Sequence, residues 1–70
     1  MKPQTATDMR RWQTYLIDQL RAKYKGKPHE ERCVRHHRRR FSSTGKCRLY
    51  AEKFPDEYAL FVAKERMGLL

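Results

Sequence analysis

The sequence predicts a small all-α single domain of three to four helices over residues 8–68, with a flexible N-terminal arm over residues 1–7. Three observations lead to this fold class. The chain has 70 residues, enough for one domain with a small core. Its apolar residues recur at spacings of three and four, which is the period of one helix face. Clusters of glycine, proline and serine separate these periodic segments and supply the turns.

The first helix is expected to begin at Thr7, which suits an N-cap, with Asp8 favourable in the first turn. Gly26 supplies the C-terminal stop, and Pro28 prevents the helix from continuing. The apolar stripe of this helix would be formed by Met9, Trp12, Leu16, Leu20 and Tyr24.

The middle of the chain contains a second helix, expected from near residue 28 to about residue 40. Its apolar face is thin and consists of Cys33, Val34, His37 and Phe41. The Ser-Ser-Thr-Gly sequence at residues 42–45 is typical of a turn. Residues 46–53 fit either a helix or a short strand in which apolar and charged residues alternate. A helix is favoured, because one isolated strand would have nothing to pair with.

The last helix begins around Pro55, which fits a first helical turn, and ends at Gly68. Phe54 is placed to act as a hydrophobic staple. The apolar stripes together predict a core of Trp12, Leu16, Leu20, Val34, Phe41, Leu49, Phe54, Tyr58, Phe61 and Val62.

The positive charge is concentrated in residues 21–48. This stretch holds 11 of the 17 Lys and Arg residues and 2 of the 8 acidic residues, so it accounts for the whole formal charge of +9. Charge localised in this way indicates an acidic partner, which could be nucleic acid, an acidic protein surface or anionic lipid. No apolar run reaches the ~20 residues that span a membrane, so no membrane partner is predicted.

The N-terminus lacks the hydrophobic segment of a signal peptide, and two cysteines do not make a disulfide framework. A reduced, cytoplasmic protein is therefore expected.

We expect the partner to contact a basic patch centred on the second helix, where Arg32, Arg35 and Arg39 would share one face. The arginine fork binds carboxylates or phosphates through two parallel hydrogen bonds. Cations also stabilise helix C-termini, which offers an alternative explanation for part of this charge. That role needs only one or two cations per helix, fewer than are present. The predicted partner-binding residues are Arg10, Arg11, Arg32, Arg35, Arg38, Arg39, Arg40, Lys46 and Arg48.

The histidines and cysteines raise the alternative of a zinc site. Residues His29, Cys33 and His37 are spaced by four, and Cys47 could fold back across the turn to complete a tetrahedral set. There is no Cys-x-x-Cys knuckle, however, and spacing of four equally places residues on a core stripe. A Cys33–His37 catalytic pair would lack a third group to orient it. No metal, cofactor, small-molecule substrate or enzyme activity is therefore predicted.

Nucleic-acid binding is the alternative function. Aromatic residues could stack on bases, and Tyr15, Tyr24 and Tyr50 are the candidates for exposure. The segment from residue 30 to residue 53 also allows a helix-turn-helix, although Asn and Gln side chains that read bases are scarce in its second helix.

The size, the charge, the N-terminal arm leading into residues 9–12 (Met-Arg-Arg-Trp) and residues 35–40 (Arg-His-His-Arg-Arg-Arg) resemble small phage-encoded regulators of bacterial RNA polymerase, of the Xanthomonas phage type. This resemblance implies a cytoplasmic protein of the bacterial host cell that binds polymerase subunits. It also implies inhibition of sigma-dependent initiation and antitermination. The resemblance transfers no site residues.

Overall fold

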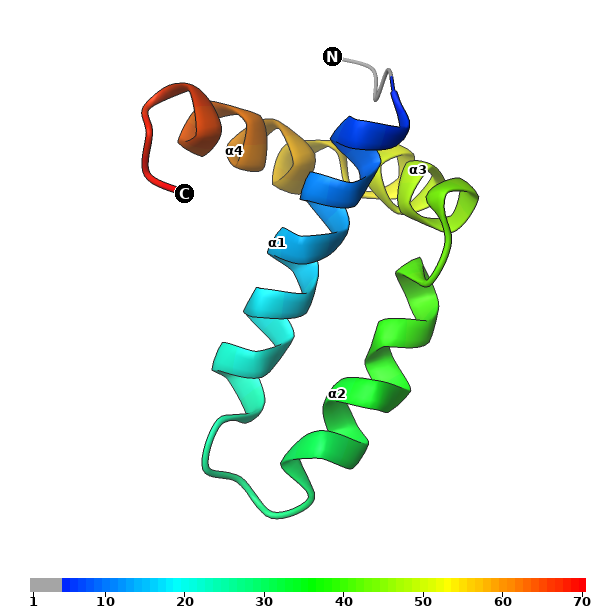
Figure 1. Ribbon diagram of the computed structural model, residues 1–70, viewed down its shortest axis with the longest axis vertical. Helices are drawn as coiled ribbons and strands as arrows, with labels where there is room; N and C mark the ends of the chain where they lie inside the picture. The colour runs from blue at the N-terminus through cyan, green and yellow to red at the C-terminus, as the bar shows by residue number, and fades with distance from the viewer. Residues whose placement is uncertain (1–4) are drawn as a thin grey trace.

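The computed structural model describes residues 5–70 (Figure 1). Its elements are α1 (Ala6–Tyr24), α2 (Glu30–Arg38), the 3₁₀ turn η1 (Arg39–Phe41), α3 (Thr44–Lys53) and α4 (Pro55–Arg66). There is no strand within the described residues, so the predicted all-α fold is confirmed and residues 46–53 are helical. Figure 1 shows α1 and α2 as an antiparallel hairpin, with α3 and α4 lying across the N-terminal half of α1.

The helix α1 begins earlier than the sequence suggested. The cap is Thr5, whose Oγ1 accepts a hydrogen bond from the Asp8 N–H at 3.1 Å, rather than Thr7. Both threonines could cap a helix, and the observed choice leaves Asp8 in the first turn, where its charge complements the helix dipole. Of the predicted arm, residues 1–4 lie outside the described residues.

The hairpin between α1 and α2 is closed by local contacts. Gly26 has a φ of 76°, the left-handed conformation expected at a helix end, and its N–H donates to the Glu30 carboxylate at 2.9 Å. His29 is also left-handed, with a φ of 61°, so α2 begins at Glu30 rather than near residue 28. The helix then ends at Arg38 and tightens into η1, two residues before the predicted end at Arg40.

The turns on either side of α3 have clear chemical causes. Ser43 caps α3 by accepting the Lys46 N–H at 3.2 Å through its hydroxyl. Phe54 is the single residue between α3 and α4, and Pro55 begins α4, where a missing N–H has no consequence.

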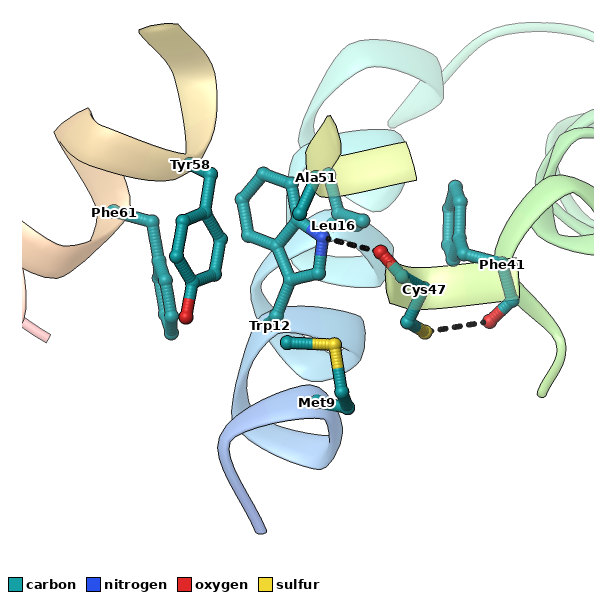
Figure 2. Close-up of a cluster of buried hydrophobic side chains, with 8 residues drawn as sticks. All are labelled: Met9, Trp12, Leu16, Phe41, Cys47, Ala51, Tyr58 and Phe61. Carbon is teal, nitrogen blue, oxygen red and sulfur yellow. Dashed lines mark hydrogen bonds between the residues drawn. The ribbon is translucent and has the colours of Figure 1, made fainter. Parts of the chain in front are cut away.

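The core is organised around Trp12, whose side chain is fully buried. Its ring centroid lies 5.1 Å from that of Tyr58 and 5.4 Å from that of Phe61, so α4 packs directly on α1 (Figure 2). The indole Nε1 donates to the Cys47 carbonyl at 3.2 Å, which ties α1 to α3. The cluster of buried residues consists of Met9, Trp12, Leu16, Phe41, Cys47, Ala51, Tyr58 and Phe61.

The carbonyl of Phe41 fixes the position of η1. It accepts one hydrogen bond from Gln13 Nε2 at 2.8 Å. It accepts another from Cys47 Sγ at 3.2 Å, which Figure 2 shows. The first partner belongs to α1 and the second to α3. The 3₁₀ turn is therefore held from two sides, and so are the arginines that precede Phe41.

Six of the ten predicted core residues are buried, namely Trp12, Leu16, Val34, Phe41, Tyr58 and Phe61, and the prediction is wrong for Leu49 and Phe54. Leu49 is 65% exposed and Phe54 is 37% exposed, although both were expected inside. For Leu49 the reason is rotational: α3 presents Cys47 and Ala51 to the core, and two residues along a helix turn a side chain by about 200° to the opposite face. Phe54 lies after the end of α3, in the single-residue connection to α4. Leu20 and Val62 lie at the core edge and are only partly buried.

Candidate partner-binding surface

All nine predicted partner-binding residues are exposed, but they do not form one continuous face. Seven of them line three separate hollows on the surface. The first lies at η1 and α3, the second along α2 beside α1, and the third on α1 beside α4. Arg32 and Arg48 line none of these three hollows.

The largest of these hollows is an open groove of about 560 Å³ between η1 and α3. Its cationic walls are Arg39, Arg40, Lys46 and Lys53. Its apolar lining is made of Leu49, Tyr50 and Phe54, and we call the whole feature the basic groove. Among the described residues that line it, none is acidic.

The geometry of the basic groove follows from the end of α2. The chain tightens into η1 after Arg38. As a result, Arg39 and Arg40 line the groove beside α3 and do not continue the surface of α2. Lys46 Nζ donates to the Arg39 carbonyl at 3.4 Å, which holds the two sides of the groove together.

The apolar lining of the basic groove is an aromatic pair. The rings of Tyr50 and Phe54 lie 4.7 Å apart, and Lys53 Nζ lies 5.7 Å from the Phe54 centroid. The most exposed apolar side chain of the groove is Leu49.

The second basic hollow is smaller and partly neutralised. Its volume is about 290 Å³, and it contains Arg21, Arg35 and Arg38 together with two acids, Glu30 and Glu31. Consequently Arg35 and Arg39, which the sequence placed on one face, line different hollows. The acids reduce the attraction of this hollow for an acidic partner.

The third group of predicted residues lies on α1, beside α4. Arg10 and Arg11 line a hollow of about 420 Å³ with Glu65 and Leu70. Arg11 Nη1 is 3.9 Å from Glu65 Oε2, an exposed ion pair of the kind that adds little stability. These two arginines are not part of the basic groove.

A fourth hollow, which the sequence did not suggest, adjoins the basic groove at Tyr50. It has a volume of about 350 Å³, and we call it the apolar hollow. Its charged lining residues are Lys23 and Glu57, and its apolar lining comes from Tyr15, Leu16, Leu20, Phe41, Tyr50 and Leu60. Sequence periodicity gives no sign of it, because these side chains come from α1, η1, α3 and α4.

Tyr50 stands between the two hollows. It lines both of them, and its ring packs edge-to-face on Phe41 with centroids 5.5 Å apart. Burial raises the pKa of the Tyr50 hydroxyl, and the Glu57 carboxylate raises it further while Arg40 opposes the shift. The tyrosine therefore stays neutral and presents an uncharged wall.

His37 is part of the packing between α1 and α2. The Tyr24 hydroxyl and His37 Nε2 are 2.9 Å apart and hydrogen-bonded, and their rings stack with centroids 5.4 Å apart. The pKa of His37 is lowered by desolvation and by the neighbouring charges of Arg40, His36 and Lys23. His37 is therefore a packing residue whose neutral form is favoured.

Neither cysteine forms a disulfide, and burial raises the pKa of the Cys47 thiol, which disfavours the reactive thiolate. Across residues 5–70 no three His, Cys, Asp or Glu side chains come together as a metal-binding group, and the zinc alternative has no assembled ligand set there.

The helix-turn-helix alternative is not supported by the packing. In that motif the two helices pack on each other so that the second enters the major groove. Here α3 packs mainly on η1 and α1, and α2 packs mainly on α1.

Comparisons of the chain with protein-family models, curated proteins and solved structures gave no match. In the part of the chain that the structure describes, no helix has the length and hydrophobicity needed to cross a membrane. Function is therefore inferred from the side chains and their arrangement.

Proposed function

We propose that the protein is a non-enzymatic regulator of transcription, which binds bacterial RNA polymerase through the basic groove and thereby inhibits initiation. The observation that carries this proposal is the composition of the groove, in which four cations surround three exposed or half-buried apolar side chains. Protein interfaces combine apolar anchors with a polar rim, and charge complementarity then adds speed and selectivity to association.

The choice of RNA polymerase rests on the resemblance in size, charge and layout to phage-encoded polymerase regulators. Such a regulator would act by mass action. If it binds free polymerase more tightly than the promoter-bound form, it withdraws polymerase from initiation by the difference in binding free energy. Antitermination would arise in the same way, if the regulator binds the elongating polymerase more tightly than the form that terminates.

The alternative function is single-stranded nucleic-acid binding, which the aromatic pair of Tyr50 and Phe54 favours. Bases stack on such side chains while neighbouring cations neutralise phosphates. Four groove cations would give an affinity that falls with salt, with a logarithmic slope of roughly −3 for a single strand. A protein interface anchored by apolar contacts would lose less affinity over the same range of salt.

A pull-down from bacterial lysate tests the proposal. The tagged protein is incubated with nuclease-treated lysate, and the captured proteins are identified by mass spectrometry. Enrichment of the large polymerase subunits is expected, and their absence would refute the proposal. Electrophoretic shift assays with duplex DNA, single-stranded DNA and structured RNA then test the alternative. The alternative fails if the protein binds none of these nucleic acids more tightly than a scrambled peptide of equal charge binds them.

A further inference from the structure

Two hollows that differ in chemistry meet at one side chain. The basic groove carries four cations and no acid among its described lining residues. The adjoining apolar hollow carries one lysine and one glutamate, so its formal charge is balanced. Tyr50 lines both hollows, and Arg40 on one side and Glu57 on the other both act on its hydroxyl. The two hollows therefore form a continuous surface whose charge changes along its length.

Each hollow also exposes a leucine. Leu49 in the basic groove is 65% exposed, and Leu60 in the apolar hollow is 51% exposed. Single exposed apolar residues are ordinary, but here Leu49 and Phe54 line one hollow and Leu60 lines the next, and the half-buried Tyr50 belongs to both.

We propose that the basic groove and the apolar hollow form one docking channel for an extended or helical peptide segment of a protein partner. The segment carries aspartate or glutamate at the end that occupies the basic groove, and leucine or phenylalanine at the end that occupies the apolar hollow. This inference rests on the proposed function only in taking the partner to be a protein, and it names the chemistry that the partner must present.

Charge complementarity distinguishes this occupant from the others. A nucleic-acid strand carries phosphate along its whole length, and the apolar hollow, with its balanced charges, would not neutralise the strand beyond Tyr50. A second copy of this chain would bring a net charge of +9 toward a groove that is itself positive.

The test uses a synthetic fluorescein-labelled peptide with Asp and Glu in one half and Leu and Phe in the other. Binding is measured by fluorescence anisotropy against the full chain. Leu49→Ser and Leu60→Ser should each weaken binding by about tenfold, since a leucine buried on binding contributes roughly that factor. Leu69→Ser is the matched control, because Leu69 is 66% exposed and lines neither hollow, and it should leave the affinity unchanged.

The direction of the peptide is tested separately. A spin label on the acidic end should broaden the amide NMR signals of Lys46 and Lys53, and a spin label on the apolar end should broaden those of Leu20 and Leu60. The proposal is overturned if both labels broaden the same residues, or if they broaden the opposite sets.

Three other results would also overturn the channel. The first is that an oligothymidine binds more tightly than the peptide and that Leu60→Ser does not change the oligothymidine affinity. The second is that all three leucine variants bind the peptide with equal affinity, and the third is that the protein sediments as a dimer which Leu60→Ser dissociates. The polymerase pull-down is repeated with the same variants to separate the two proposals. Polymerase capture that survives both Leu49→Ser and Leu60→Ser would refute the channel while leaving polymerase as the partner. Peptide binding without polymerase capture would do the reverse.

Discussion

Replacing Trp12 by phenylalanine tests the packing on which the binding surface depends. The substitution removes the indole N–H that donates to the Cys47 carbonyl at 3.2 Å. A lost internal hydrogen bond costs about 1 kcal/mol. The carbonyl keeps its helical partner inside α3, so no larger penalty for an unpaired group is added.

The substitution also removes the second ring of the indole from a site that is fully buried. Truncating a buried Trp to Ala costs ~3–5 kcal/mol, and the change to Phe removes less than half of that side chain, so it costs roughly 1–2 kcal/mol. The two effects together give a loss of about 2–3 kcal/mol. A domain of this length has a total stability of roughly 4–10 kcal/mol, so the variant should still fold, with a Tm lower by about 10–20 °C.

The assay is urea denaturation followed by far-UV circular dichroism, because the variant has no tryptophan fluorescence to report unfolding. Tyr15→Phe is the control. The Tyr15 ring stacks on Trp12 with centroids 5.9 Å apart, but its hydroxyl only accepts a 3.3 Å bond from Lys64, so its loss should cost less than about 0.5 kcal/mol. If Trp12→Phe costs no more than this control, Trp12 does not organise the core as described.

Three further perturbations probe the local chemistry. Ser43→Ala removes the cap of α3 and should destabilise the protein by about 1 kcal/mol in urea denaturation, and Ser43→Asp should restore it; equal stability of all three proteins would contradict the cap. The pKa of His37 is lowered by folding, so the unfolded chain takes up the proton first and stability should fall as the pH drops through about 6.5. His37→Gln should show a smaller loss between neutral and acidic pH than the parent protein, and an identical pH profile would refute this origin. Changing Arg39, Arg40 and Lys46 together to Ser should weaken capture of polymerase with helicity by circular dichroism unchanged, and a loss of helicity would mean that these residues are structural.

The helices could be predicted because their causes are local. Glycine at position 26 and proline at position 55 determine an end and a beginning through their own backbone chemistry, and the structure has both where they were expected. The start of a helix is harder to predict where two neighbouring residues can both serve as its N-cap. Thr5 and Thr7 are both suitable caps, and local preference alone does not separate them.

The division of the basic residues could not be predicted, because it depends on a change of helix type. A continuous helix from residue 28 to residue 40 would place Arg35 and Arg39 one turn apart on one face. The chain instead ends α2 at Arg38, and the Phe41 carbonyl is then held by Gln13 of α1 and Cys47 of α3. Both contacts depend on the tertiary fold, so the spacing of apolar residues along the sequence does not predict them.

The errors in the predicted core have a common location, and that location supports the binding proposal. Leu49 and Phe54 were assigned to the core because they are large and apolar, yet both line the basic groove and are exposed. Exposing them forgoes burial worth roughly 1.5–3 kcal/mol for each side chain that could have been buried. Four cations beside them add like-charge repulsion, and the stabilisation of helix C-termini needs only one or two of these cations. Natural sequences depart from the rules of stability mainly where function demands it, so two departures in one groove favour an interface there over an accident of composition.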